Sequence, residues 1–503
     1  MRRLEDFPDA DLRIFDRPGV PPLDAIESVY LVGICGKGMG ALAELLTEAG
    51  YAVRGSDEAA YPPMSTRLAG LGIAIDEGYD PAHLDPAPDV VVIGNASVPT
   101  HPEATYAREH GLVQLSLPEA LAYFFLHGRR SLVVAGTHGK TTTAGMMAHV
   151  FRHAGLDPGF FIGGVMTNYG ATCAAGTGAH FIVEGDEYDS AYFDKRPKFM
   201  HYRPASAIVT SMEFDHADIY ADWDEYRDAF RAFVGLLPED GLLVLNGDDD
   251  EVRALADHTA ARVQFFGLQD YDDHVTASDI RPVDGGQRFR LVLKPFPVAD
   301  GGEPLTEIFL PMSGWVNRFD ALGVCAVALD EGLTPEEIVT AFASFEGMKR
   351  RQEILGEVGG VTVVDDFAHH PTAVGATVHA VQERWPSRRT VAVFEPRSNS
   401  SRRKIFEAPY AEALAEADAV FLSAPPLRHN DDPAHFIDVD AVVEQIGSQG
   451  VPATACADAD ALLPHLLSEL RPGDVALVMS NGSFGGLNQK LLAALRERET
   501  VEG

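Results

Sequence analysis

The chain has 503 residues, of which 46% are hydrophobic and 23% charged, and its formal net charge is −35 at pH 7. The length suggests about three domains, and the composition is that of a globular chain able to bury several cores. So acidic a chain argues against a nucleic-acid partner, because a phosphate backbone is bound through a basic surface. Four scattered cysteines without a C-x-x-C pair argue against a disulfide framework or a zinc site.

Residues 1–25 are charged and rich in proline, and we expect them to form a poorly ordered leader. There is no signal-peptide pattern and no uncharged apolar run near ~18 residues, which favours a cytoplasmic protein without a membrane span. From 26 to 127, strand-like segments at 29–33, 51–54 and 90–93 alternate with helix-like segments such as 41–49. This repetition predicts a doubly wound, Rossmann-like first domain.

The turn after the first strand is rich in glycine and reads GICGKGMGA from Gly33 to Ala41. It contains G-x-G-x-x-A, and Asp57 follows Gly36 by 21 residues at the end of the second strand. Taken alone, the pattern fits an NAD(P)-dependent oxidoreductase with Asp57 on a ribose hydroxyl. An amide-lined turn of this kind also suits another diphosphate, such as a UDP-sugar. The candidate binding residues are Gly36, Lys37, Gly38, Met39 and Asp57.

A second unit, 128–347, opens with the most informative motif of the chain. A strand at 131–135 leads into GTHGKTTT at 136–143 and then into a helix at 144–154. Such a turn offers backbone amides and a helix dipole to phosphate oxygens, a lysine to the β- and γ-phosphates, and a hydroxyl to Mg²⁺. The segment predicts a P-loop-type central ATPase domain that binds ATP and Mg²⁺ through Gly136, Thr137, His138, Gly139, Lys140, Thr141 and Thr142.

Two polar segments follow later strands of this unit. In FIVEGDEYD, 181–189, Glu184 is the predicted Mg²⁺ ligand beside Thr141, because Mg²⁺ prefers oxygen ligands. In SMEFDHAD, 211–218, His216 is a candidate for a second Mg²⁺ or for orienting substrate. Alternation of polar and apolar residues at 288–293 predicts an antiparallel edge region.

The third unit, 348–503, again alternates strands and helices, which predicts a second Rossmann-like domain. DDFAHHPT at 365–372 ends a strand and begins a helix. Its paired histidines, His369 and His370, suit phosphate or carboxylate contacts better than zinc, because a third clustered ligand is missing from the segment. In EPRSN at 395–399 the guanidinium of Arg397 suits a carboxylate, with Ser398 and Asn399 beside it. NGSFGG at 481–486 allows close approach of backbone to a ligand.

Taken together, these motifs resemble the Mur ligase family, ATP-dependent enzymes that add amino acids or peptides to UDP-N-acetylmuramate. The similarity runs from Ser28 to Leu492. It implies a UDP-sugar-binding first domain at 26–127, an ATP-binding domain at 128–347 and a domain for the amino component at 348–503. It also implies an ADP-forming reaction through an acyl phosphate on the lactyl carboxylate. The residues to which it gives catalytic roles are Lys140, Glu184, His216 and His370.

Four segments favour the branch of the family that adds the tripeptide L-Ala-γ-D-Glu-meso-diaminopimelate over the branch that adds L-alanine. They are YPPMST at 61–66, DDFAHHPT, EPRSN and MSNGSFGG at 479–486. The L-alanine branch typically has DDYGHHP and PHRYxR at the second and third, and it remains the alternative. The partners that we expect are small-molecule substrates only. We expect the protein itself to be a monomer or a weak homo-oligomer.

The chain departs from the family pattern in two places. The adenine-side motif G-x-H-N-x-x-N reads GWVNRFD here, which keeps Gly314 and Asn317, an ATP-binding candidate, but places Val316 and Asp320 where the family has histidine and asparagine. Several sibling ligases use a carbamylated lysine near the second metal, and this chain has no lysine between Lys198 and Lys294. The resemblance therefore assigns that place to His216.

Overall fold

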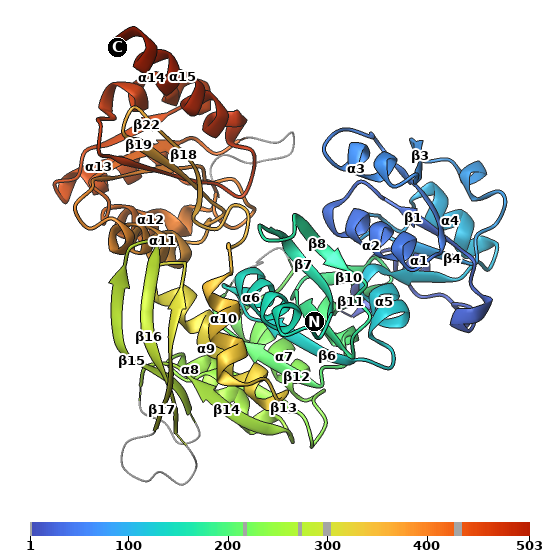
Figure 1. Ribbon diagram of the computed structural model, residues 1–503. Coiled ribbons are helices and arrows are strands. Elements are labelled where there is room, and N and C mark those ends of the chain that lie inside the picture. Colours follow the sequence, from blue (N-terminus) through green and yellow to red (C-terminus); the bar gives the residue numbers. More distant parts are fainter. Residues whose placement is uncertain (1–2, 215–218, 270–273, 295–302, 427–434, 503) are drawn as a thin grey trace.

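The computed structural model describes residues 3–214, 219–269, 274–294, 303–426 and 435–502. Its strands gather into three main sheets that follow one another along the chain, blue, then green, then orange and red in Figure 1. This confirms the predicted three-domain α/β architecture, while the predicted boundaries themselves stay predictions. Within the ranges given, no helix has the length and hydropathy needed to cross a bilayer.

Five parallel strands form the first sheet, in the order β3-β2-β1-β4-β5. The strand order reverses at β1, so the turn after β1 lies at the switch point where open α/β sheets bind ligands. The apolar residues of β1 and β4 are buried because helices cover both faces of the sheet. The elements are β1 (Ser28–Val32), α2 (Lys37–Glu48), β2 (Ala52–Asp57), α3 (Met64–Gly70), β3 (Ala74–Glu77), β4 (Val90–Ile93), α4 (Pro102–Glu109), β5 (Gln114–Ser116) and α5 (Leu117–Leu121).

The central sheet has ten strands within the described ranges, in the order β17-β16-β15-β14-β13-β12-β6-β9-β7-β8. The strands from β14 to β7 in this order are parallel, while β15, β16 and β17 pair antiparallel, as predicted for 288–293. A separate hairpin joins β10 (Asp189–Ala191) to β11 (Asp194–Pro197). The other elements are β6 (Arg130–Ala135), α6 (Lys140–His153), β7 (Gly159–Met166), β8 (Ala171–Ala174), β9 (His180–Glu184), β12 (Ser206–Val209), α7 (Trp223–Val234), β13 (Leu242–Asn246), α8 (Asp250–Arg253), β14 (Arg262–Phe266), β15 (His274–Val283), β16 (Gly286–Lys294), β17 (Glu303–Leu310), α9 (Trp315–Asp330) and α10 (Pro335–Ala343).

The third sheet has the order β18-β19-β23-β20-β21-β22, and only its first pair, β18 with β19, is antiparallel. The predicted strands of this unit are all present. Its elements are β18 (Glu353–Val358), β19 (Val361–Asp366), α11 (Pro371–Arg384), β20 (Thr390–Phe394), α12 (Glu407–Leu414), β21 (Ala419–Ser423), α13 (Val439–Ser448), β22 (Ala453–Cys456), α14 (Ala459–Glu469), β23 (Val475–Met479) and α15 (Leu487–Glu502).

The prediction of a poorly ordered leader is wrong for the described part of residues 1–25. This segment contains α1 (Ala10–Arg13) and packs where the first domain meets the β10–β11 hairpin. Arg13 donates to the carbonyl oxygen of Tyr192 at 3.0 Å, and Arg17 forms an ion pair with Glu119 at 2.9 Å. The ring of Phe15 stacks on Tyr192 with centroids 6.3 Å apart. Arg13 and Arg17 of this segment thus have partners distant in the sequence.

The third domain meets the central domain along α11, which lies above the yellow-green strands in Figure 1. A Cβ atom on Gly314, at the start of α9, would lie 2.5 Å from the Cβ of Ala380 in α11. Glycine at this place of the GWVNRFD segment therefore allows the two helices to approach closely.

Candidate active site

The predicted phosphate loop connects β6 to α6. Gly136 and Gly139 have φ values of +132° and +80°, in the region that favours glycine. A Cβ atom on Gly136 would lie 2.1 Å from Thr210 Oγ1, so this position also lacks room for a side chain. Gly139 immediately precedes α6, and the first amides of the helix are thereby directed into the loop. This geometry is suited to an anion such as a nucleotide phosphate.

Lys140 is paired with a carboxylate that the sequence did not single out. Its Nζ lies 2.8 Å from Glu187 Oε2, and Glu187 is completely buried. Burial by itself lowers the pKa of Lys140, but the Glu187 and Asp186 carboxylates outweigh it and hold the pKa above its usual value. Lys140 is therefore a fixed positive charge at the mouth of the loop. Glu187 lies in the acidic segment after β9, three residues from the predicted ligand Glu184.

The two predicted Mg²⁺ ligands within the described residues lie side by side. Thr141 Oγ1 donates to Glu184 Oε1 at 3.0 Å, and the amide of Gly163 in β7 donates to Glu184 Oε2 at 2.7 Å. A Cβ atom on Gly163 would lie 2.9 Å from Glu184 Oε2, and one on Gly164 would lie 2.7 Å from Thr141 Cγ2. Two glycines of β7 thus leave room for the pair. A hydroxyl and a carboxylate together suit Mg²⁺. The third predicted ligand, His216, lies outside the described residues.

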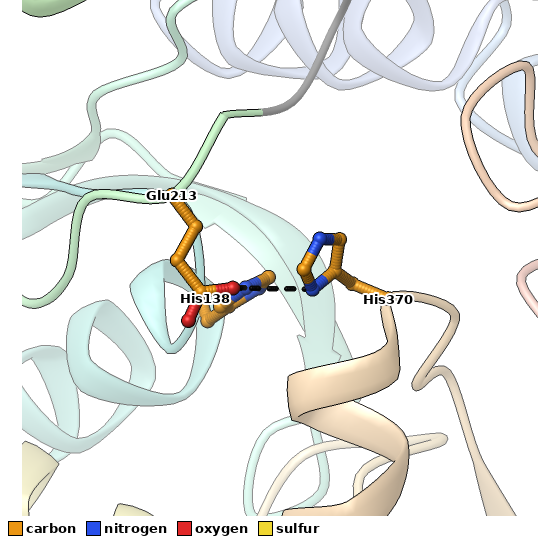
Figure 2. Close-up of side chains that lie close together, drawn as sticks. All are labelled: His138, Glu213 and His370. Atoms are coloured by element: carbon orange, nitrogen blue, oxygen red, sulfur yellow. Dashed lines mark hydrogen bonds and ion pairs between the residues drawn. The ribbon is translucent and has the colours of Figure 1, made fainter. Parts of the chain in front are cut away.

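A second group of side chains joins the phosphate loop to the third domain. His138 Nε2 and His370 Nδ1 lie 3.1 and 3.2 Å from the same oxygen, Glu213 Oε2; in Figure 2 a dashed line joins the carboxylate to the His370 ring, and His138 overlaps the carboxylate in the view. Thr372 Oγ1 donates to this oxygen at 2.8 Å. Burial raises the pKa of Glu213, but the contacts with His138, Thr372 and His370 outweigh it, and the pKa lies below its usual value. The sequence named the two histidines separately and missed Glu213.

Asp320, which replaces an asparagine of the family motif, lies against the phosphate loop. A Cβ atom on Gly139 would lie 2.7 Å from Asp320 Oδ1. Burial raises the pKa of Asp320 to about 8, so the carboxyl is mostly protonated at pH 7. The neighbouring candidate Asn317 is buried and donates from Nδ2 to the carbonyl oxygen of Ser313 at 2.6 Å. Protonation makes Asp320 resemble the neutral amide that it replaces.

Three cations from two domains surround one aromatic ring near the loop. Lys37 Nζ and the guanidinium carbons of Arg350 and Arg351 lie 5.9, 5.2 and 4.9 Å from the centroid of Phe367. Burial and the two arginines lower the pKa of Lys37. Among the described residues, Arg350 pairs with Asp365, and neither Lys37 nor Arg351 has an ion pair. This excess of positive charge in an acidic protein favours an anionic ligand between the first and third domains.

The predicted acceptor residues follow β20. A Cβ atom on Gly482 would lie 2.4 Å from Arg397 Cδ, so the NGSFGG loop provides the space in which Arg397 lies. Ser398 Oγ accepts from the amide of Ser401 at 2.9 Å, and Asn399 Oδ1 accepts from Arg402 at 3.3 Å. Ser398 and Asn399 thus support the loop, while Arg397 is half-buried beside it.

The predicted sugar-nucleotide residues lie at the turn after β1. Gly36 immediately precedes α2, and Asp57 Oδ2 accepts from the amide of Cys35 at 2.8 Å. The side chain of Met39 is buried in the core, so only its backbone is available to a ligand. A Cβ atom on Gly38 would lie 3.0 Å from Leu117 Cδ1, so the end of that side chain would have to shift slightly to admit it. Within this turn, Lys37 is the residue whose charged group reaches toward the third domain.

Family models and several known proteins match most of the chain. Three family models match: "Mur ligase family, catalytic domain" at 28–129, "Mur ligase middle domain" at 134–328, and "Mur ligase, glutamate ligase domain" at 350–482. The UDP-N-acetylmuramate–L-alanyl-γ-D-glutamyl-meso-2,6-diaminoheptandioate ligase of Haemophilus influenzae is 39% identical, covering 94% of this chain and all of the relative. The UDP-N-acetylmuramate–L-alanine ligase of Desulforapulum autotrophicum is 35% identical, covering 93% and 98%.

Among solved structures, a murein peptide ligase from Psychrobacter arcticus superposes with a TM-score of 0.68 at 34% identity, covering 93% of this chain and 99% of that one. These matches span all three domains. The first-domain match also overturns the oxidoreductase interpretation of the GICGKGMGA turn, which had rested on the glycine pattern alone.

Proposed function

The chain belongs to the Mur ligase family, and from this we propose that it joins L-Ala-γ-D-Glu-meso-diaminopimelate to UDP-N-acetylmuramate with conversion of ATP to ADP. The tripeptide is supported by the name of the 39% identical relative, against 35% for the L-alanine ligase. The observation that carries the chemistry is the meeting of the phosphate loop with His370 of the third domain at Glu213 (Figure 2). The site around Glu213 thereby adjoins both the proposed nucleotide-binding loop and the proposed acceptor domain.

The reaction makes a carboxylate electrophilic before an amine attacks it. A lactyl carboxylate oxygen bonds to the γ-phosphorus of ATP and ADP leaves, which gives an acyl phosphate. The L-alanyl nitrogen then bonds to the acyl carbon, the C–O bond to phosphate breaks, and the nitrogen loses a proton. Lys140 and the amides at the start of α6 stabilise the phosphate charge in the first step, which depends mainly on positioning and electrostatics.

Thr141 and Glu184 are the described residues that would hold Mg²⁺. When bound, Mg²⁺ would neutralise charge on the β- and γ-phosphates. His216 is proposed as a further ligand on the resemblance alone. The oxygen donors fit this ion, and Gly163 and Gly164 leave room for the two side chains beside the phosphate loop.

Arg397 is proposed to bind a carboxylate of the acceptor peptide, and His370 to contact the reacting groups. The cations around Phe367 would face the negative charge that develops between the first and third domains. A cytoplasmic location is supported by the four cysteines, all of which are described and free. A monomer or weak homo-oligomer stays a prediction.

The experiment that tests this function measures ADP release from ATP with UDP-N-acetylmuramate and one of two acceptors. We expect turnover with the tripeptide at a kcat/KM at least tenfold above that with L-alanine. Preference for L-alanine would assign the enzyme to the other branch. Absence of ADP release with either acceptor, in a protein that still binds ATP, would contradict the ligase assignment.

A further inference from the structure

The backbone of Glu213 is hydrogen-bonded to the phosphate loop. Thr137 Oγ1 donates to the carbonyl oxygen of Glu213 at 3.0 Å, and the amide of Glu213 donates to Thr137 Oγ1 at 2.9 Å. The same hydroxyl lies 2.9 Å from the phenol oxygen of Tyr226, which is completely buried. The position of Glu213 is therefore set by the loop and by the core under it.

The side chain of Glu213 extends from this support to the third domain. Its Oε2 contacts His370, which immediately precedes α11, and Thr372 in the first turn of that helix. On the loop side the same oxygen contacts His138, two residues before Lys140. Figure 2 shows Glu213 and His370 approaching each other from separate segments of the chain, joined by the dashed line. One oxygen thus connects the start of the acceptor-domain helix to the nucleotide loop.

We propose that Glu213 is a positioning residue that fixes α11 of the third domain against the phosphate loop. The acceptor amine is thereby held at reacting distance from the activated carboxylate. The proposal rests on the proposed function and adds a residue that neither the motifs nor the family resemblance assigned. Positioning of this kind acts on the second step, because the amine must approach the acyl carbon from a domain other than the one that binds ATP.

The contacts explain why a carboxylate is needed here. A single oxygen accepts a hydrogen bond from a hydroxyl and interacts with two imidazole nitrogens, and a carboxylate oxygen has the acceptor capacity for this. A glutamine at this place keeps the length of the side chain but loses the charge. A valine at Thr372 keeps the shape but loses the donor, whereas a serine retains it.

The test compares Glu213→Gln, Thr372→Val and Thr372→Ser in the full-length enzyme, with Glu239→Gln as the control. Glu239 is an exposed carboxylate of the same domain, after α7. We expect Glu213→Gln and Thr372→Val to lower kcat about tenfold and to raise the KM for the tripeptide several-fold. The Kd for ATP should stay within about twofold. Thr372→Ser and Glu239→Gln should resemble the wild type.

A double variant separates a shared contact from two independent effects. Glu213→Leu removes both acceptor oxygens, so if Glu213 acts through Thr372, adding Thr372→Val to Glu213→Leu should cause no further loss of kcat. Multiplied losses, or a changed melting temperature with unchanged KM for the tripeptide, would overturn the proposal in favour of a purely structural role. Activity of the wild type with the tripeptide is measured in parallel, so a failure of the proposed function is recognised separately.

The two imidazoles and the carboxylate also have a spacing at which a transition-metal ion binds, since their ligand atoms lie within 4.8 Å of one another. Direct contact and metal bridging are distinguished by treating the enzyme with a chelator, removing the chelator and assaying with Mg²⁺ alone. We expect full activity. Activity that is lost and returns only with Zn²⁺ would overturn the direct contact.

Discussion

Lys140, the proposed catalytic cation, is held in place by its ion pair with the buried Glu187. Lys140→Ala should lower kcat by about 10²–10³-fold, because the charge that meets the phosphates is removed. The same change leaves Glu187 buried without its cation, which is strongly destabilising. The double variant Lys140→Met, Glu187→Gln removes both charges and should recover the melting temperature but not kcat. Near-normal turnover in either variant would contradict the phosphate-loop assignment.

Asp320 gives the site a pH dependence that an asparagine would not. Its pKa is about 8 in the folded protein because of burial, against an ordinary value of 3.8, so the folded state keeps a proton that the unfolded state has lost. Between pH 4 and 8 the stability of the wild type should therefore fall relative to Asp320→Asn, by up to about 1.4 kcal/mol per pH unit, and the difference should level off above pH 8.

The prediction for Asp320 is checked by melting temperatures of both proteins at pH 5, 7 and 9, with the KM for ATP measured at pH 7 and 9. A negative charge beside Gly139 opposes phosphate binding, so the KM should rise at pH 9 in the wild type more than in Asp320→Asn. A pH-independent difference between the two proteins would show that the carboxyl ionises normally.

The proposed role of Arg397 in binding the acceptor peptide can be tested with a single substitution. Arg397→Lys keeps the charge but loses the planar pair of donors that suits a carboxylate. We expect the KM for the tripeptide to rise about tenfold while the KM for UDP-N-acetylmuramate stays the same. An unchanged KM for the tripeptide would remove Arg397 from acceptor binding.

The sequence predicted the proximity of residues whose positions depend on their neighbours in the chain, while the roles of these residues stay predictions. Thr141 and Glu184 each follow a strand of a parallel sheet, and their meeting at 3.0 Å follows from that placement. Glu213 and Glu187 could not be selected, because their partners lie 157 and 47 residues away and depend on how domains and strands pack. Asp320 was noticed as a departure, but its proximity to Gly139 requires the fold.

Helix α6 has a glycine with φ near +80° just outside each end, so the effect of the loop conformation on ATP binding can be tested against a matched position on the same element. Gly139→Ala would force a Cβ atom to 2.7 Å from Asp320 Oδ1, whereas nothing lies within 4 Å of a Cβ on Gly155, at φ +78°. Both changes carry the same backbone strain, about 1 kcal/mol. We expect Gly139→Ala alone to raise the KM for ATP, by tenfold or more, and equal effects at the two ends would contradict a role for the loop conformation.

Elements with a clear hydrophobic period were predictable, and those defined by long-range contacts were not. The runs at 90–93, 132–135 and 475–478 are buried strands because each is a continuous apolar segment bounded by polar turns. The alternation at 288–293 correctly indicated antiparallel pairing. The leader has neither pattern, and its structure depends on Tyr192 and Glu119, which belong to other parts of the fold.

At the scale of the whole molecule, the leader joins the first domain to the central domain. The buried rings of Tyr192 and Phe193 belong to the same apolar cluster as Tyr30 and Val32 of the first sheet, and Phe15 packs against this cluster. Arg17 lies over Phe193, 4.7 Å from the ring centroid, while paired with Glu119. The segment therefore covers the contact between the two domains, and removing it exposes apolar surface worth about 1.5–3 kcal/mol for each large side chain.

Deletion of residues 1–20 should lower the melting temperature and raise the KM for UDP-N-acetylmuramate several-fold, because the first domain is then held less firmly over the phosphate loop. The Kd for ATP should not change, since no residue of the loop contacts the leader among the described residues. Phe15→Ala should reproduce part of the effect, and Ile14→Ala is the matched control, because Ile14 is its chain neighbour and 49% exposed. If both single changes were silent and the deletion affected only stability, the leader would act as a cover for the core rather than as a link that orients the sugar-nucleotide domain.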